Sequence, residues 1–456
     1  MKSPRFWSRV FVYDMMSTKM SERKIILLVA GVILASFAYS LYYRAVPASD
    51  AQAYNLIAQN LVSGRGYVED SQNSLTPEKD EAIIRVGPGY QFFLAIIYAL
   101  FGQHLWIVWL MHAILRGMSA FLLHRLSLII SPGHKTAALV AAGIFGFWPD
   151  LIVVNGLLLT ETLFLFLLIS ASYVSAKLLR ETSWIRSIVA GVLWGVAILT
   201  RPTALFPLAI IAGLLAWKSA YKQVLVLTVV AGLCVAPWSI FVTKRFGSFI
   251  LTTTVGGYDL WVGNNPDARG GFEKIPEIQE ARARYHSVEL DKIGKKKYFK
   301  FLVSDPLAFT ELQIRKTALY FSLLRPTGFW FHLGDRPLER AVTTVASFLW
   351  TACFFIGGLA GAYMLFRGNA WWSPQMMMIF FALAQVAAVV PLIVETRYRY
   401  SLYPFLALFA AHVFMQYKIS RTALAVSFAF LLFWTGYDFV AHAGEIVGKI
   451  HIILSL

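Results

Sequence analysis

The chain has 456 residues, of which 58% are hydrophobic and 14% are charged. This composition excludes an ordinary soluble domain, because it includes repeated apolar runs of about 20 residues, long enough to cross a bilayer. The net charge of +16 does not indicate nucleic-acid binding, since the basic residues are scattered among loops, where membrane orientation and anionic lipids account for them. We therefore predict an all-α polytopic membrane protein whose surroundings are membrane lipids.

The first predicted element is a membrane span over residues 25–43, which follows a basic tail over residues 1–24. The positive charges of the tail are expected to hold the N-terminus in the cytoplasm. The apolar run has no small-residue cleavage site, so the sequence predicts an uncleaved span rather than a signal peptide.

Residues 44–102 are predicted to form a first outer loop that carries two amphipathic helices. One helix is expected to begin at Asp50, because Ser49 and Asp50 are typical capping residues and apolar side chains then recur at helical spacing up to Gly64. The other, within residues 87–102, is too short for an ordinary span and is expected at the interface. Asp50 is either a cap or a functional carboxylate.

The remaining apolar runs predict ten further spans, eleven in all, arranged in one transmembrane domain over residues 25–456. Six are expected at residues 104–126, 137–154, 160–178, 185–199, 203–217 and 224–242, and four at 342–366, 376–394, 401–414 and 424–440. A large outer loop over residues 243–338 separates the two sets. Its apolar segment 309–324 contains Glu311, Arg315 and Lys316, which favours an interfacial helix over a span.

With this topology, several ionisable residues collect at the outer ends of the spans. Such a cluster indicates function, because each charge near the hydrocarbon costs free energy, although span ends also carry charges for ordinary reasons. Glu161 lies on an apolar run, where it forms either a structural ion pair or a functional site. Pro202 restricts Arg201 to a non-helical joint, from which its guanidinium can bind a phosphate.

Two later stretches could bind a ligand. Residues 395–400 place Arg397 and Arg399 beside a carboxylate and two tyrosines, which suits a phosphorylated lipid headgroup but is also typical of an interfacial aromatic and basic belt. The loop 253–271 is rich in glycine and asparagine, which favour turns. Its Trp261, Asn264 and Asn265 are also the kinds of residue that stack on and hydrogen-bond a sugar.

Taken together, these stretches resemble the GT-C superfamily of glycosyltransferases that use lipid-linked sugars, in particular bacterial relatives of the dolichyl-phosphate-mannose–protein mannosyltransferases and of the aminoarabinose transferases. The matching segments follow the order of the family and are residues 49–67, 85–90, 159–163, 199–203, 237–238, 260–266 and 395–399.

The resemblance implies roles for particular residues. Asp50 is similar to the acid of the first outer loop that acts as general base in an inverting displacement, and Glu161 to a second acid that orients the acceptor. Arg201 and Arg397 would neutralise the departing polyprenyl phosphate. The other implied donor-phosphate residues are Arg85 and Arg399, and the implied sugar or acceptor residues are Tyr54, Tyr90, Trp261, Asn264 and Asn265.

The resemblance also allows a divalent cation, Mg or Mn, shared between Asp50 and Glu161. Many relatives carry two adjacent acids at the first position, whereas Ala51 follows Asp50 here. This departure counts more against the predicted metal site than against the predicted role of Asp50 as general base.

The implied function is transfer of a hexosyl or pentosyl group from a polyprenyl-phosphate donor to a lipid, glycan or protein acceptor. The implied location is the bacterial inner membrane, with the active site on the periplasmic or extracellular side. A transporter of a lipid-linked sugar is the rival interpretation, since it would use the same arginines without a base. A non-catalytic assembly subunit is a third.

Overall fold

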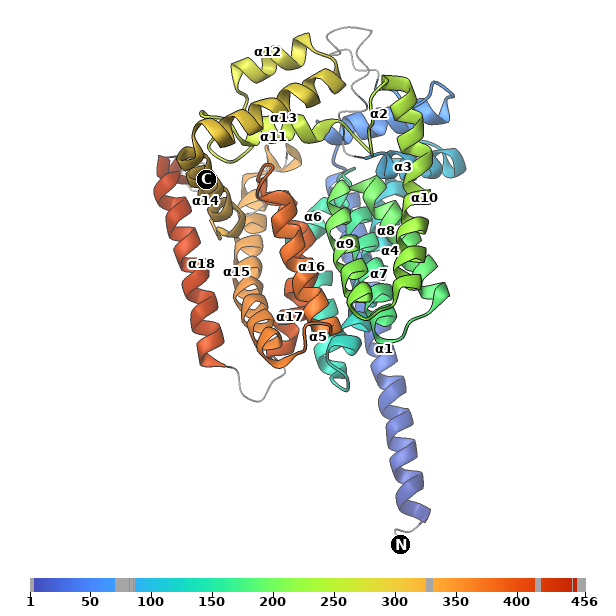
Figure 1. Cartoon of the computed structure of the whole chain (residues 1–456). Coiled ribbons are helices and arrows are strands. Elements are labelled where there is room, and N and C mark those ends of the chain that lie inside the picture. Colours follow the sequence, from blue (N-terminus) through green and yellow to red (C-terminus); the bar gives the residue numbers. More distant parts are fainter. Residues whose placement is uncertain are drawn as a thin grey trace.

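The computed structural model describes residues 4–69, 82, 85, 87–324, 331–414, 420–444 and 446–448. Within these residues every regular element is a helix, as the sequence predicts. Helices stand side by side in a bundle, and shorter helices lie across one end of it (Figure 1).

The first half of the bundle carries the predicted first outer loop. Its helices are α1 (Pro4–Tyr43), α2 (Asp50–Val62), α3 (Gly89–Phe101), α4 (Leu105–Ile130), α5 (Lys135–Gly146), α6 (Pro149–Asn155), α7 (Glu161–Arg180), α8 (Trp184–Thr200), η2 (Pro202–Ala204), α9 (Leu205–Trp217) and α10 (Tyr221–Phe246). Helices α2 and α3 lie at the end of the bundle away from the N-terminus (Figure 1).

The second half follows a group of helices that lie over the same end. These are α11 (Val255–Gly263), α12 (Pro276–Arg284), α13 (Ser287–Ser304) and α14 (Pro306–Phe321). The remaining elements are η3 (Phe331–Leu333), α15 (Pro337–Gly368), α16 (Pro374–Val389), η4 (Thr396–Leu402), α17 (Tyr403–Phe414) and α18 (Arg421–Ala441). We call α11, α12 and α13 the roof helices.

Six helices in the described part of the chain are long and apolar enough to cross a membrane, or seven if the bent pair α5 and α6 forms one span. Helices α3, α8 and α16, and the segment Pro202–Trp217, are apolar but shorter. The predicted number of eleven spans therefore stays a prediction. Segment 309–324 falls mostly in α14, which is not among the candidate spans.

The structure adds two details of secondary structure that the sequence predictions did not specify. The segment 137–154 is not one straight helix, because α5 and α6 meet at a bend of 54° where Pro149 begins α6. The predicted tail is helical from Pro4 and continuous with the first span, so that α1 has 40 residues. A helix of this length is about 60 Å long, roughly twice the hydrocarbon thickness.

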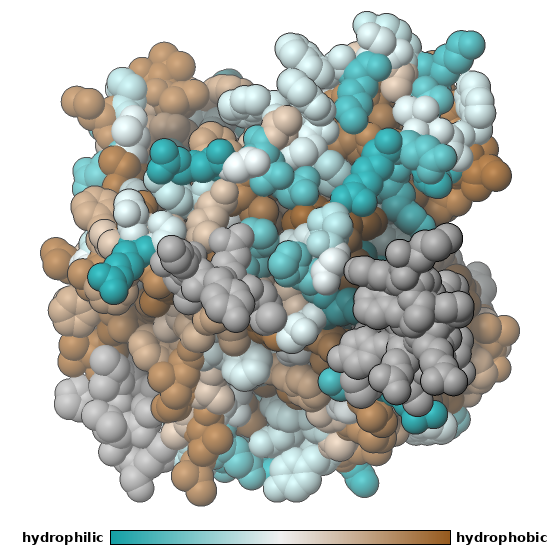
Figure 2. Space-filling view, turned by 90° about the horizontal axis from the view of Figure 1, so that it is seen from below, coloured by the Kyte–Doolittle hydropathy of each residue, from teal (hydrophilic) through white to brown (hydrophobic). Residues whose placement is uncertain are grey.

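The outward faces of the bundle are apolar. Helix α10 exposes Leu225, Val229, Leu233 and Ile240, which recur at helical spacing on one face. Figure 2 shows the molecule from below: hydrophobic side chains predominate along its left and right edges, and hydrophilic ones gather nearer the middle. This arrangement suits a bundle surrounded by lipid.

The roof contains a helix where the sequence predicted a turn-rich loop. Helix α11 includes Gly256 and Gly257, which disfavour helix formation, but tertiary packing compensates for them. A Cβ at Gly257 would overlap the carbonyl oxygen of Asp291 on α13, and a Cβ at Gly294 would overlap the carbonyl oxygen of Gly257. The two glycines let the backbones of α11 and α13 touch, which fixes the roof.

Candidate functional site

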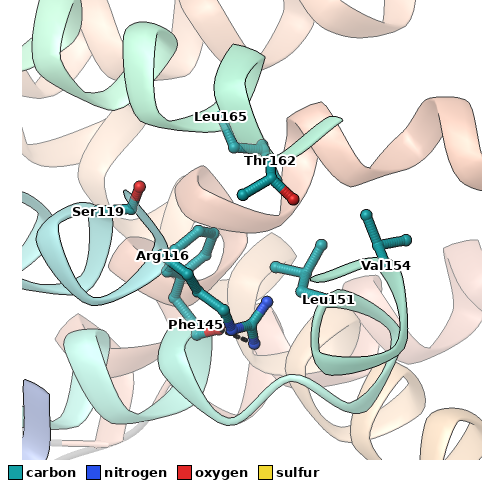
Figure 3. A pocket seen from close by; sticks show the side chains of 7 residues that line it. All are labelled: Arg116, Ser119, Phe145, Leu151, Val154, Thr162 and Leu165. Carbon is teal, nitrogen blue, oxygen red and sulfur yellow. Dashed lines mark hydrogen bonds between the residues drawn. The ribbon is translucent and has the colours of Figure 1, made fainter. Parts of the chain in front are cut away.

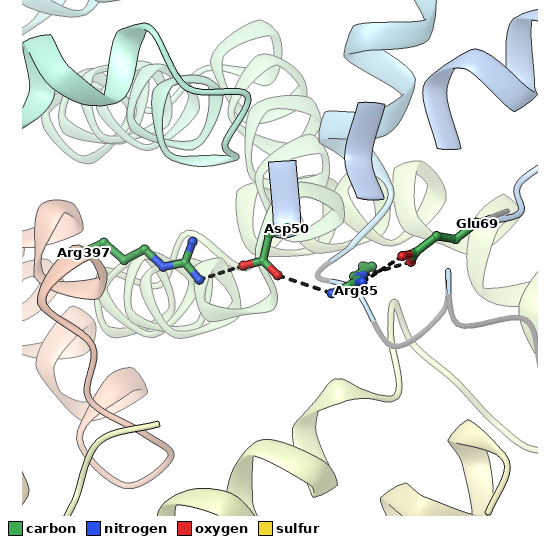
Figure 4. A network of polar contacts seen from close by, with 4 residues as sticks. All are labelled: Asp50, Glu69, Arg85 and Arg397. Atoms are coloured by element: carbon green, nitrogen blue, oxygen red, sulfur yellow. Dashed lines mark hydrogen bonds and ion pairs between the residues drawn. The ribbon is translucent and has the colours of Figure 1, made fainter. Parts of the chain in front are cut away.

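Asp50 lies at the start of α2, but it does not serve merely as a helix cap. The N-cap position is Ser49, whose φ of 53° is left-handed and whose side chain makes no capping hydrogen bond. The Asp50 carboxylate lies between two guanidinium groups, 2.7 Å from Arg397 and 3.3 Å from Arg85 (Figure 4). Asp50 thus joins the segment 44–102 to the segment after α16.

Arg85 is itself held in place by a carboxylate that the sequence analysis missed. Its guanidinium donates two hydrogen bonds to Glu69, of 2.9 and 2.8 Å, and its remaining nitrogen faces Asp50 (Figure 4). A paired, fork-like geometry of this kind fixes the orientation of the guanidinium. Glu69 could have been found only by its proximity to a loop arginine, since nothing in its neighbourhood forms a motif.

The glycines of the segment 85–90 explain how it reaches the site. A Cβ at Gly87 would overlap the carbonyl oxygen of Leu199, and one at Gly89 would crowd Thr200. The start of α3 therefore packs directly on the end of α8. This contact brings Arg85 to the same end of the bundle as Arg201, which follows α8.

Glu161 and Arg201 form a second ion pair. The Glu161 side chain is 2% exposed, and one of its oxygens lies 2.6 Å from a guanidinium nitrogen of Arg201. Arg201 also donates to the Thr160 hydroxyl at 2.9 Å. The backbone of Arg201 is extended, as Pro202 predicts, so the side chain turns back onto the start of α7.

The two ion pairs belong to one cluster. The ring of Tyr398 lies 5.4 Å from the guanidinium carbon of Arg397 and 5.9 Å from that of Arg201, within the range of cation–π attraction. Arg397 interacts electrostatically with both Asp50 and Glu161. We call Asp50, Arg85, Glu161, Arg201 and Arg397 the polar cluster.

Electrostatics within the polar cluster keep Asp50 ionised. Burial opposes its ionisation, but Arg397, with help from Arg85 and Arg201, outweighs burial and holds the pKa of the carboxyl below its usual value. The exposed fractions of the Asp50, Arg85, Arg201 and Arg397 side chains lie between 14% and 27%, so a ligand can reach them.

Tyr54 and Tyr90 lie beneath the polar cluster rather than on an open surface. Their rings are 4% and 0% exposed and meet edge to face at 5.7 Å. Tyr54 interacts electrostatically with Asp50 and Glu161, whereas the Tyr90 hydroxyl is hydrogen-bonded to His112 at 3.1 Å. Tyr90 also interacts electrostatically with Glu161, and the role of both tyrosines in sugar or acceptor binding stays a prediction.

Arg399 lies apart from the polar cluster. It is 1% exposed, donates to the carbonyl oxygen of Ser322 at 2.9 Å and lies over the ring of Phe355. The short 3₁₀ helix η4 turns the side chains of Arg397 and Arg399 to different sides, because it has about three residues per turn. The structure therefore gives Arg399 a packing role, and its predicted phosphate contact is not supported.

Trp261, Asn264 and Asn265 are used inside the roof. Trp261 is 3% exposed and packs in an apolar cluster with neighbours such as Tyr258 and Ile278. The Asn265 amide donates to the carbonyl oxygens of Trp261 and Val262. Burial therefore gives no support to the prediction that these side chains stack on a sugar.

Asn264 joins α11 to the loop that leads to Arg397. Its amide nitrogen donates to the carbonyl oxygens of Leu260, Pro391 and Leu392. Its oxygen accepts from the Lys316 ammonium group at 2.6 Å, and Lys316 is itself 0% exposed. This network positions the segment that carries Arg397.

A further carboxyl group belongs near the polar cluster. Asp259, on α11, interacts electrostatically with Asp50 and Arg397 and is partly exposed. Burial, followed by the charge of Asp50, raises its pKa to about 7. Sequence reasoning missed Asp259, because it lies in the stretch interpreted as a turn-rich loop.

The acids do not fit a shared divalent cation. Both oxygens of Asp50 are engaged by arginines, and Glu161 is paired with Arg201. Among the described residues no group of three or more histidine, cysteine or acidic side chains is arranged to hold a metal ion. Cations bound by carboxylates normally need several such oxygens. We therefore derive no step through a metal.

A small cavity lies inside the bundle, next to the bend between α5 and α6. Arg116 points into it, with Leu151 and Val154 on one side and Thr162 and Leu165 on the other (Figure 3). The guanidinium of Arg116 donates to the carbonyl oxygen of Gly146 at 2.7 Å, which satisfies backbone groups freed at the bend. The lining includes none of the polar cluster.

Comparisons with known proteins bear on the fold of the chain. A family model described as dolichyl-phosphate-mannose-protein mannosyltransferase matches residues 85–241, a segment that contains Arg85, Glu161 and Arg201. The crystal structure of the Archaeoglobus fulgidus oligosaccharyltransferase in the apo form is similar with a TM-score of 0.50 at 14% identity. The similarity covers 92% of this chain and 56% of that chain.

The chain has the GT-C fold. The same archaeal enzyme in complex with zinc and sulfate is similar at a TM-score of 0.50 and 15% identity, over 90% of this chain and 51% of that one. ArnT from Cupriavidus metallidurans bound to undecaprenyl phosphate has a TM-score of 0.44 and 15% identity, over 91% and 64% of the two chains. The GT-C chain described here thus spans about half the length of the archaeal enzyme. A search of the curated proteins found no match.

Proposed function

We propose that this GT-C chain is a membrane glycosyltransferase that moves a sugar from a polyprenyl-phosphate donor to an acceptor. The observation that carries the proposal is the polar cluster: two acids and three arginines, from five separate segments, meet at one end of an apolar bundle. The ArnT neighbour binds undecaprenyl phosphate, which is a lipid of the proposed class. The acceptor is a lipid, a glycan or a protein.

The arginines suit the phosphate of the donor. Arg201 and Arg397 both lie near the Tyr398 ring, at 5.9 and 5.4 Å, and both are partly exposed. As the bond between the anomeric carbon and the phosphate oxygen breaks, its electron pair stays on that oxygen, and the phosphate gains negative charge. Fixed guanidinium groups stabilise this charge more in the transition state than in the ground state.

The carboxylates suit the acceptor. In an inverting displacement the acceptor hydroxyl attacks the anomeric carbon on the face opposite the phosphate, and its proton passes to a base. Asp50, the base predicted from the resemblance, is ionised and can accept a hydrogen bond from this hydroxyl. Glu161 is nearly fully buried and acts through Arg201, whose orientation it fixes.

The proposed location is the bacterial inner membrane, with the N-terminus in the cytoplasm and the polar cluster on the periplasmic or extracellular side. The basic residues before the first span support this orientation. Figure 1 supports placing the N-terminus and the polar cluster on opposite sides of the membrane, because α2, α3 and the roof helices lie at the end opposite the N-terminus. A transporter would be expected to hold its substrate near the middle of the membrane, whereas these charges lie at one end of the bundle.

Cysteine accessibility tests the placement of the cluster. Single cysteines at Ser63 and Ser373, exposed or partly exposed at opposite ends of the bundle, would be labelled in intact cells with a membrane-impermeant reagent. We expect labelling at Ser63→Cys and protection at Ser373→Cys. Labelling with the reverse pattern would place the polar cluster on the cytoplasmic side and contradict the proposed orientation.

A further inference from the structure

Asp259 is a roof carboxyl group that interacts electrostatically with both Asp50 and Arg397. It lies in the middle of α11 (Val255–Gly263) and is partly exposed. Its carboxyl makes no hydrogen bond or ion pair with any described residue. By contrast, Asp50 is bound by two guanidinium groups (Figure 4). The site thus offers Asp259 as an available carboxyl group beside the carboxylates of Asp50 and Glu161, which are paired with arginines.

The position of Asp259 is fixed from both ends of its helix. Near the start of α11, the Gly257 amide donates to the Asp291 carboxylate at 2.8 Å, and the close contact with Gly294 holds α11 against α13. At the end of α11, a Cβ at Gly263 would overlap the carbonyl oxygen of Leu392. The helix is therefore packed between α13 and the loop before η4, which carries Arg397.

Several other titratable or charged groups surround α11. They are Asp50 on α2, Arg397 and Tyr398 on η4, Arg282 on α12, and Asp291 and Lys297 on α13. Lys297 is directed to the Trp261 ring and to Glu277, and Arg282 lies over the Tyr258 ring. Asp50 and Arg397 act on the Asp259 carboxyl, which also interacts electrostatically with Tyr398.

We infer that Asp259 is a catalytic residue that receives the proton of the acceptor hydroxyl, while Asp50 orients that hydroxyl and holds Arg85 and Arg397 in place. This inference rests on the proposed function. In the step, the hydroxyl oxygen forms the new bond to the anomeric carbon, the bond to the phosphate oxygen breaks with its electron pair, and the proton joins the Asp259 carboxylate. The neutral carboxyl then loses the proton to water.

Proton affinity separates the two acids. A base acts best when its pKa is near the working pH, because it is then both available and basic. The pKa of Asp50 is held below its usual range, whereas that of Asp259 is raised to about 7. When the pKa values of two neighbouring carboxyl groups are separated in this way, one group can exchange a proton while the other stays ionised.

The test is the pH dependence of sugar transfer by the full-length protein in proteoliposomes. With Asp259 as the proton acceptor, kcat/KM of the wild type is expected to fall about tenfold per pH unit below 7. Asp259→Asn is expected to lower kcat by about 100-fold or more and to remove this dependence. Asp267→Asn serves as the matched control, because Asp267 is exposed just after α11. A wild-type rate that is level from pH 5.5 to 8, or an Asp259→Asn variant with wild-type kcat, would overturn the inference.

A second measurement separates failure of the inference from failure of the proposed function. Infrared difference spectra of the purified protein between pH 8 and pH 6 are expected to show a protonated carboxyl band that is lost in Asp259→Asn and retained in Asp267→Asn. The same band in Asp259→Asn would show that Asp259 does not take up a proton, and would overturn the inference whatever the donor. If the band behaves as expected but no polyprenyl-phosphate donor is consumed by the wild type, the proposed function fails, and the catalytic role inferred from it fails too.

Discussion

The Asp50 carboxylate accepts a hydrogen bond of 2.7 Å from Arg397, a residue 347 positions later in the chain. The contact joins the start of α2 to the segment between α16 and α17, and so connects the two halves of the bundle. Arg85 binds the other oxygen of Asp50, so the carboxylate is shared between two guanidinium groups (Figure 4). The shared carboxylate sets the orientation of two arginines that we assign to a phosphate-handling site.

Loss of Arg397 is expected to affect chemistry more than donor binding. Arg397→Gln removes a cation beside the departing phosphate and is expected to lower kcat about 100- to 1,000-fold. Arg397→Lys keeps the charge but not the paired geometry, and its kcat is expected to lie between those of Arg397→Gln and the wild type. Steady-state transfer assays on both variants give kcat and KM for the donor. Arg367→Gln, in the exposed last turn of α15 and outside the polar cluster, is the control, and an equal effect there would show that the loss is nonspecific.

The buried pair Glu161–Arg201 predicts a specific pattern of stability. Glu161→Gln leaves the Arg201 guanidinium without its charge partner in a largely buried site, which is expected to cost about 3 kcal/mol of unfolding free energy. Replacing both residues, as Glu161→Gln with Arg201→Gln, is expected to restore part of this loss. Thermal unfolding in detergent gives the comparison. A double variant less stable than either single variant would contradict the pairing.

Glycine packing in the roof gives a closely matched pair of variants. A Cβ at Gly257 would overlap the backbone of α13, so Gly257→Ala is expected to destabilise the roof by about 1–3 kcal/mol and to reduce transfer. Nothing lies within 4 Å of a Cβ at Gly256, so Gly256→Ala is expected to be neutral or stabilising. Protease resistance of the segment 264–276 is the readout. Equal behaviour of the two variants would refute the packing argument.

Lys316 predicts a pH dependence of stability. Burial lowers its pKa to about 7, whereas the group has its ordinary pKa in the unfolded chain. Between pH 7 and about 10 the unfolded state therefore binds more protons, and the contribution of Lys316 to stability rises with pH by up to about 1.4 kcal/mol per unit. The difference in unfolding temperature between Lys316→Met and the wild type is expected to shift in favour of the wild type as the pH rises from 7 to 9, whatever Met loses in hydrogen bonds. A difference that is independent of pH would contradict the lowered pKa.

The charge balance of the polar cluster predicts that transfer does not need a divalent cation. A metal ion at Asp50 would have to displace Arg85 or Arg397, both of which are already bound to its oxygens. Transfer measured with an excess of a chelator such as EDTA is expected to equal transfer with added Mg²⁺ or Mn²⁺. Activity that disappears with chelator and returns with one cation would show that the arginines rearrange.

Sequence reasoning found the features that depend on local patterns. Apolar runs gave the order of the helices, the residues 50–62 formed the predicted short helix, and Pro202 gave the extended joint at Arg201. The resemblance also selected Asp50, Glu161, Arg201 and Arg397, which the structure brings together. Each of these features has a signal within a few residues of its position.

The features that were missed depend on packing between distant segments. Helix α11 forms because two glycines allow close contact with α13, and no local pattern reveals that contact. Arg397 and Arg399 look equivalent in sequence, but only Arg397 reaches the polar cluster, while Arg399 is directed to Ser322. Asp259 has no motif at all, and only its position beside Asp50 and Arg397 indicates a role.

The most direct test of the central claim is transfer of radiolabelled sugar from purified polyprenyl-phosphate donors to a membrane extract by the reconstituted protein. We predict that the wild type labels an acceptor, and that Arg397→Gln binds the donor but transfers little. The labelled product would then identify the acceptor class. Transfer by neither protein, with movement of the donor across the bilayer by both, would contradict the account and favour the transporter.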